Sequence, residues 1–120
     1  MDGSAAAHAQ VDDVDRWIRV LVVGEPTEEM VRKVNAEVLA LTQAGRGPAV
    51  LLDARRMLPP PSQIAWLQRD LLWRLESIVR CAVVVADSRC AFLARIAFGD
   101  ANYRIFYEDL EAAERWLAAG

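Results

Sequence analysis

The sequence is poor in the residues on which nucleic-acid-binding domains and polybasic membrane anchors rely. It contains one lysine, Lys33, and its longest run of basic residues is the pair Arg55–Arg56. The formal net charge at pH 7 is −3 over 120 residues. Proteins that bind DNA or RNA usually carry a basic surface that displaces counterions from the phosphates. The sequence therefore argues against a nucleic-acid partner and against a polybasic anchor.

Metal ligands and disulfide partners are equally scarce. His8 is the only histidine, Cys81 and Cys90 are the only cysteines, and no CxxC pair occurs. A zinc site needs more ligands than this supply offers. We expect no metal and no cofactor, and two free thiols, as in a reducing cytoplasm.

Long apolar segments are also missing. The longest unbroken apolar run, Cys81–Ala86, is far shorter than the ~18 residues of a membrane-spanning helix. Residues 1–10 lack the apolar core of a signal peptide. We therefore expect a cytoplasmic protein with no transmembrane segment.

No catalytic motif is present. Gly24 and Gly99 belong to neither a GxGxxG nor a phosphate-loop pattern, and no GxSxG elbow occurs. A Ser-His-Asp triad would depend on His8, close to the N-terminus. The sequence predicts a protein that is not an enzyme.

What the sequence does contain is a regular alternation of short apolar runs with longer segments of helical periodicity. This order predicts one α/β domain over residues 6–120, with a mixed, mostly parallel sheet of about four or five strands, about four helices and a disordered segment at residues 1–5. A weak first strand would form an antiparallel edge, and the second strand lacks clean alternation, so we expect it to be covered on both faces. The expected strands are 7–11, Trp17–Val23, Ala49–Leu52, Cys81–Ala86 and Tyr103–Phe106, and the helices begin near Thr27, Ser62, Ser88 and Asp109.

The order of these segments resembles the SpoIIAA-like branch of the STAS superfamily over roughly residues 16–118. The segments that carry the resemblance are Leu21–Gly24, Leu51–Asp53, Ala82–Asp87, Tyr103–Phe106, Asp109–Ala113 and Trp116–Leu117. The resemblance implies a bacterial, non-enzymatic binding or regulatory domain that acts through protein–protein contacts. It also allows an alternative, a carrier or sensor of a small apolar or lipid ligand, because such domains resemble lipid-carrier folds.

The better-known members of that family are anti-sigma-factor antagonists that bind a kinase-like partner. The resemblance implies a switch by phosphorylation of a serine in an Asp-Ser-Ser-Gly-like segment just after the third strand. Here Asp53 is followed by Ala54-Arg55-Arg56, and the nearest serine, Ser62, lies beyond three prolines. We therefore expect a regulatory domain without the usual phosphoserine switch.

Two sets of residues are candidates for a site. The first is a weak anion or ligand site at the ends of two strands, made of Asp53, Arg55, Arg56, Asp87, Ser88 and Arg89. Carboxyl ends of parallel strands are where α/β sheets bind ligands, and paired carboxylates there could hold Mg²⁺ or exchange protons. Asp53, Asp87 and Ser88 fit equally well as caps of the following helix or turn, and the arginines as solvated loop residues.

The second set lies on the helix that begins at Ser62. At ~100° per residue, an apolar stripe of Ile64, Leu67, Leu71, Leu75 and Ile78 faces the core. Trp66 and Trp73 fall opposite that stripe, and exposed aromatic residues often mark contact surfaces. With Leu58 and Ser62 they form a candidate interface of a homodimer, a contact for a protein partner, or a lid over an apolar pocket. The alternative is that the Pro-rich segment or a neighbouring helix covers them.

Overall fold

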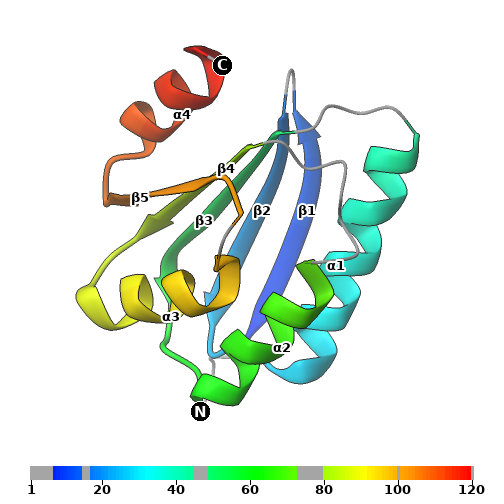
Figure 1. The fold of residues 1–120 in the computed structure, drawn as a ribbon, viewed down its shortest axis with the longest axis vertical. Helices are drawn as coiled ribbons and strands as arrows, with labels where there is room; N and C mark the ends of the chain where they lie inside the picture. The colour runs from blue at the N-terminus through cyan, green and yellow to red at the C-terminus, as the bar shows by residue number, and fades with distance from the viewer. Residues whose placement is uncertain (1–6, 15–16, 45–48, 73–79, 100, 120) are drawn as a thin grey trace.

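The computed structural model describes residues 7–14, 17–44, 49–72, 80–99 and 101–119. Across these residues it has five strands and four helices, which confirms the predicted α/β class (Figure 1). In chain order they are β1 (His8–Val14), β2 (Trp17–Gly24), α1 (Glu28–Gln43), β3 (Ala49–Met57), α2 (Ser62–Leu72), β4 (Arg80–Val85), α3 (Ser88–Phe98), β5 (Tyr103–Tyr107) and α4 (Leu110–Ala119). Residues 1–5, expected to be disordered, and Trp73, Leu75 and Ile78 of the predicted helix lie outside the described residues.

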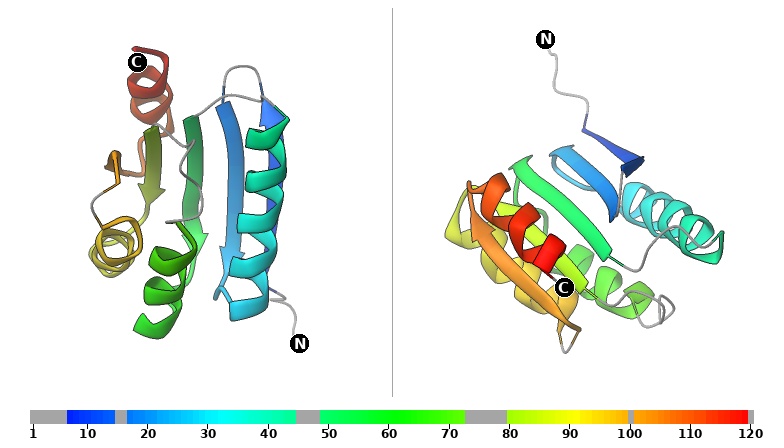
Figure 2. Two further views of the ribbon diagram at one scale, coloured as in Figure 1. Left: turned by 45° about the vertical axis from the view of Figure 1, so that its right-hand side comes forward. Right: turned by 90° about the horizontal axis from the view of Figure 1, so that it is seen from above.

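The strands stand in the sheet in the same order as in the sequence, β1-β2-β3-β4-β5. β1 runs antiparallel to β2, with Val11 opposite Val20, and every other neighbouring pair is parallel. The antiparallel edge is therefore confirmed. Because each crossover advances one strand in the same direction, right-handed connections place α1, α2 and α3 on one face of the sheet. The chain leaves β5 toward the other face, where α4 lies (Figure 2).

Short polar side chains begin three of the helices. Thr27 accepts a hydrogen bond from the Met30 amide at 3.2 Å, Asp87 from Cys90 at 2.8 Å, and Asp109 from the amide of residue 112 at 3.0 Å. Each satisfies an amide that the first helical turn leaves without a partner. α2 begins at Ser62, directly after the three prolines.

The apolar core has two layers. The larger layer lies between the sheet and α1, α2 and α3, and the smaller lies between α4 and strands β3, β4 and β5. Val83 and Val85 of β4 belong to the first layer and Ala82 and Val84 to the second. An unbroken apolar run is what a strand buried on both faces requires.

The second strand departs from its prediction. Ile18, Val20 and Val22 are buried, but Arg19 and Leu21, which alternate with them, remain partly exposed. The expectation that this strand is covered on both faces is wrong, because α4 packs on β3, β4 and β5. Among the described helices, none is long and apolar enough to cross a membrane.

Candidate functional site: an apolar cavity between the sheet and three helices

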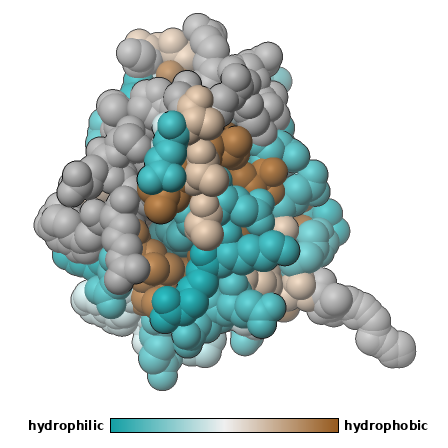
Figure 3. All heavy atoms as spheres, turned by 90° about the vertical axis from the view of Figure 1, so that its right-hand side faces the viewer, coloured by the Kyte–Doolittle hydropathy of each residue, from teal (hydrophilic) through white to brown (hydrophobic). Residues whose placement is uncertain are grey.

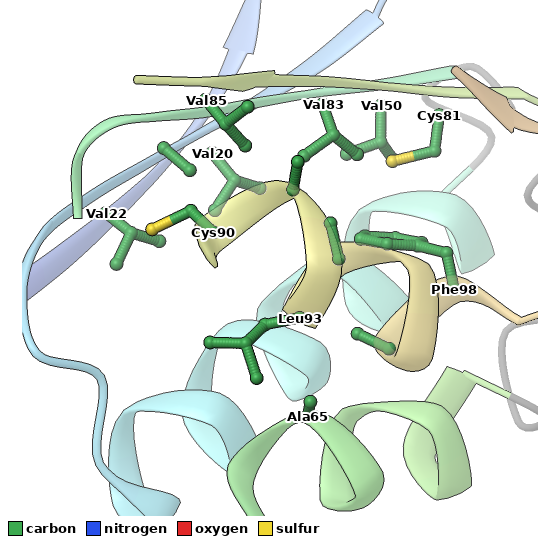
Figure 4. Close-up of a cluster of buried hydrophobic side chains, with 14 of the residues drawn as sticks. Val20, Val22, Val50, Ala65, Cys81, Val83, Val85, Cys90, Leu93 and Phe98 are labelled. Atoms are coloured by element: carbon green, nitrogen blue, oxygen red, sulfur yellow. The ribbon is translucent and has the colours of Figure 1, made fainter. Parts of the chain in front are cut away.

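A cavity of about 140 Å³ lies inside the larger core layer. Strands β2, β3 and β4 form its floor, α1 and α3 its sides, and α2 its roof. In Figure 4, Val83 and Val85 point from the sheet toward the helices, and Leu93 of α3 and Ala65 of α2 lie on the far side. The space is open to solvent on one side, so it is a pocket in the core layer rather than a sealed void.

Small side chains keep the cavity open. The residues that line it include Ala54 on β3, Ala65 on α2, and Ala94 and Ala97 on α3. α2 packs mainly against α3 and α1 rather than against a strand, so its short Ala65 side chain spans little of the distance to the sheet. An engineered apolar cavity of about 150 Å³ stays dry and binds benzene or xenon. The cavity therefore has the volume of a small ring or a short aliphatic chain.

The side of the cavity that reaches solvent is the seam between α1 and α2. The lining residues of the sheet and α3 are mostly buried, whereas Met30, Val31 and Val34 of α1 and Ile64 and Gln68 of α2 are partly exposed. On the face of the molecule that carries α1, hydrophobic atoms show in patches between hydrophilic ones (Figure 3).

Two amide side chains join the helices at that seam. Asn35 Nδ2 donates to Gln68 Oε1 at 2.8 Å, and Gln68 Nε2 donates to Asn35 Oδ1 at 3.1 Å. Asn35 Nδ2 also donates to the carbonyl of Val31 at 2.7 Å, one turn earlier in α1. Of the described residues that line the cavity, none carries a charge. The site is an apolar space with one neutral polar pair on its wall.

Both cysteines are free thiols, as predicted, and both line the cavity. Burial raises the pKa of Cys81 to about 12. Burial, and secondarily the nearby carboxylate of Asp87, raises the pKa of Cys90 to about 11. Because the thiolate is the reactive form, neither cysteine is an activated nucleophile, and both act as small apolar wall residues.

The predicted anion site is not assembled as one cluster. β3 continues to Met57, so Asp53 lies within the strand rather than at its end, and it does not line the cavity. It is 3% exposed and pairs with Arg55, while Arg19 Nη2 lies 3.8 Å from its Oδ2. Hydrogen bonds from Arg55 lower the pKa of Asp53 despite the opposing effect of burial. The carboxylate is ionised and already engaged, as a buried charge must be.

The remaining members of that set lie elsewhere. Asp87 caps α3, Ser88 and Arg89 are exposed on its first turn, and Arg56 is exposed on β3. Among the described residues, no hydrogen bond or ion pair joins Asp87, Ser88 or Arg89 to Asp53 or Arg55. Across the described part of the chain, no group of three histidine, cysteine or acidic residues is placed to hold a metal ion.

The predicted interface residues lie around α2. Trp66 is 52% exposed, with the Arg69 guanidinium carbon 5.5 Å from its ring centroid, and Leu58 is 57% exposed. Ser62, the first residue of the helix, is exposed. Trp66 and the cavity are therefore on different sides of α2, because Ala65 and Gln68 line the cavity and Trp66 does not. Trp73 is outside the described residues.

The sequence pattern did not identify Asn35 and Gln68 as functional residues. The available signal was an amide residue within the mainly apolar stripe of α1, between Val34 and Val38. A polar side chain in such a stripe needs a partner once it is buried. The sequence does not show that this partner lies 33 residues further along the chain, on α2.

The chain is similar to known proteins in both sequence pattern and fold. A family model described as SpoIIAA-like matches residues 17–118. A sequence comparison with curated proteins finds no match.

Among solved structures, an uncharacterised protein of the DUF3478 family from Shewanella loihica, described as having a SpoIIAA-like fold, is 21% identical with a TM-score of 0.71, over 98% of this chain and 99% of the other. The anti-sigma-factor antagonist SpoIIAA in its unphosphorylated form is 16% identical with a TM-score of 0.70, over 93% and 99%. An anti-sigma-factor antagonist from Mycobacterium paratuberculosis is 16% identical with a TM-score of 0.70, over 98% and 99%. At these identities the likeness is one of fold.

Proposed function

The chain belongs to the SpoIIAA-like family, and we propose that it is a non-enzymatic domain that binds a small apolar molecule in the cavity beneath α2. The main observation behind the proposal is the cavity of about 140 Å³, whose described lining residues are almost all apolar. Ligand sites are typically concave and mostly apolar, with a few polar groups that fix orientation. The free thiols of Cys81 and Cys90 support a reducing compartment such as the cytoplasm as part of this proposal.

Filling the cavity tests this function. Ala65→Leu adds three carbon atoms at a position that is 4% exposed and lines the cavity. We expect toluene to bind the native protein saturably, as followed by chemical-shift changes in the amide NMR spectrum, and to lose at least tenfold in affinity in this variant. Ala118→Leu, the same change at an exposed position on α4, is the matched control and should bind toluene as the native chain does.

A second candidate function is regulation through protein contacts, without the usual phosphoserine switch. The fold neighbours that are described as anti-sigma-factor antagonists support it, as does the exposed indole of Trp66 close to Leu58 and Ser62 in sequence. The contact would be with a regulatory protein or with a second copy of this chain. The two functions are compatible, because α2 lines the cavity with one side and exposes Trp66 on another.

A further inference from the structure

If the cavity holds an apolar ligand, as the proposed function has it, the Asn35–Gln68 pair would restrict the chemistry of that ligand. The pair lies on the cavity wall at the α1–α2 seam, and Asn35 is 8% exposed. A buried amide needs hydrogen-bond partners, and here the two side chains satisfy each other.

The pair keeps capacity for one more partner. Asn35 uses both of its N–H groups, on Gln68 and on the carbonyl of Val31. Gln68 uses one N–H, on Asn35, so its second N–H has no partner among the described residues. Each amide oxygen accepts one hydrogen bond and has a second lone pair. A neutral ligand group that donates, accepts or does both therefore finds a complement at the seam.

The described part of the lining carries no charge, which disfavours ionised ligands. None of the described lining residues is lysine, arginine, histidine, aspartate or glutamate. A carboxylate, phosphate or ammonium group would lose its hydration with no opposite charge to replace it, and that cost is large in an apolar interior. An alcohol, ketone or amide loses much less.

We propose that the cavity takes an uncharged amphiphile, with an apolar body of about the size of benzene and one hydroxyl, carbonyl or amide group that hydrogen-bonds to the Asn35–Gln68 pair. The volume sets the size of the apolar body, and the amides determine which polar group is accepted and where it lies. Asn35 and Gln68 are then the residues that determine specificity, while the valines and alanines supply apolar contact.

Four small probes of similar shape test the inference: toluene, benzyl alcohol, benzoate and benzylamine. Their dissociation constants are measured by NMR titration of the native protein and of the double variant Asn35→Leu, Gln68→Leu. This variant removes both amides at once, so no buried amide is left without a hydrogen-bond partner. We expect the ratio of the toluene to the benzyl alcohol dissociation constant to fall about tenfold in the double variant, the value of roughly one hydrogen bond. Benzoate and benzylamine should bind neither protein.

Each other outcome is decisive. If toluene binds but the ratio is unchanged in the double variant, the anchoring role is overturned and the proposed function stands. If benzoate or benzylamine binds more tightly than benzyl alcohol, the neutral ligand class is overturned. If no probe binds, the apolar-ligand function itself fails. Should the double variant not fold, Gln68→Met, at a partly exposed position, is expected to lower the same ratio several-fold, and an unchanged ratio would overturn the anchor.

Discussion

Asp53 and Arg55, two residues apart on β3, form a two-point ion pair in which Arg55 Nε lies 2.9 Å from Oδ1 and Nη2 lies 2.8 Å from Oδ2 of the carboxylate. The Arg55 backbone amide also donates to Oδ1, at 3.2 Å. All three bonds end on a side chain that is almost fully buried. The pair is thus a structural feature of the sheet, and its removal should be measurable as a loss of stability.

We expect Asp53→Ala to lower the free energy of unfolding by about 1–3 kcal/mol, because it leaves the Arg55 guanidinium without its partner. Urea denaturation followed by circular dichroism measures this. The matched control is Glu111→Ala, which removes an exposed ion pair to Arg115 at 3.7 Å and should cost less than about 0.5 kcal/mol. Equal losses of unfolding free energy in the two variants would show that the buried Asp53–Arg55 pair stabilises the fold no more than an exposed ion pair does.

The same pair predicts a dependence of stability on pH. Hydrogen bonds from Arg55 lower the pKa of Asp53 below its ordinary 3.8 in the folded state. A depressed folded-state pKa gives stability that is fully present above the unfolded-state pKa and is lost as the pH falls through the folded-state pKa. The stability difference between the native chain and Asp53→Asn should therefore shrink as the pH drops below about 4. A difference that stays constant from pH 7 to pH 2 would contradict this.

Both cysteines should react slowly in the folded protein. With the pKa of Cys81 raised to about 12 and that of Cys90 to about 11, almost no thiolate exists at pH 8. We expect the reaction with a disulfide reagent such as Ellman's to be many times slower than in 8 M urea, where both thiols are solvated. Rapid, stoichiometric labelling of the folded chain would mean that the cavity wall opens readily.

Replacement of Trp66 tests the second candidate function, regulation through protein contacts. Because its side chain is half exposed, Trp66→Ala should change the free energy of unfolding by less than about 0.5 kcal/mol. If the native chain self-associates through this surface, light scattering should show a lower mass for the variant. Phe92→Ala, at an equally exposed aromatic residue on α3, should leave the mass unchanged. The double change Trp66→Ala, Trp73→Ala should act in the same direction, and an unchanged mass in both variants would remove the case for a homodimer through these tryptophans.

The phosphorylation prediction is negative. Ser62 is exposed at the start of α2, but it follows three prolines and no Asp-Ser-Ser-Gly segment follows β3. We expect no regulatory phosphoserine at the family's usual place, just after β3, as judged by phosphopeptide mapping of protein isolated from its own cells. Stoichiometric phosphorylation of Ser62 by a cognate kinase would contradict this.

The sequence was most informative where one local signal determines the structure. The run Cys81–Ala86 predicted β4, whose described span is Arg80–Val85, and Asp87 caps the next helix. Burial on both faces of a strand and helix capping each produce a recognisable sequence pattern within a few residues. The extent of β3 was missed. A register shift between Leu21 and Val23 of β2 accompanies its continuation to Met57, and the Arg55–Arg56 pair did not suggest a strand.

The cavity could not be predicted from the sequence, for a different reason. It depends on how far α2 stands from the sheet, and on small residues such as Ala65 and Ala94 facing the same space from different helices. Periodicity identifies which residues face the core, but it does not show whether their side chains fill it. The Asn35–Gln68 pair has the same long-range character.

A crystal structure determined under xenon pressure shows most directly whether the cavity beneath α2 binds an apolar guest. Xenon enters dry apolar cavities of this size and scatters strongly. We predict a xenon atom between α2 and the sheet, in contact with Ala65 and Val83, and none at that position in Ala65→Leu. A structure in which the space is closed by neighbouring side chains or filled by ordered water, with no xenon bound, would contradict the account.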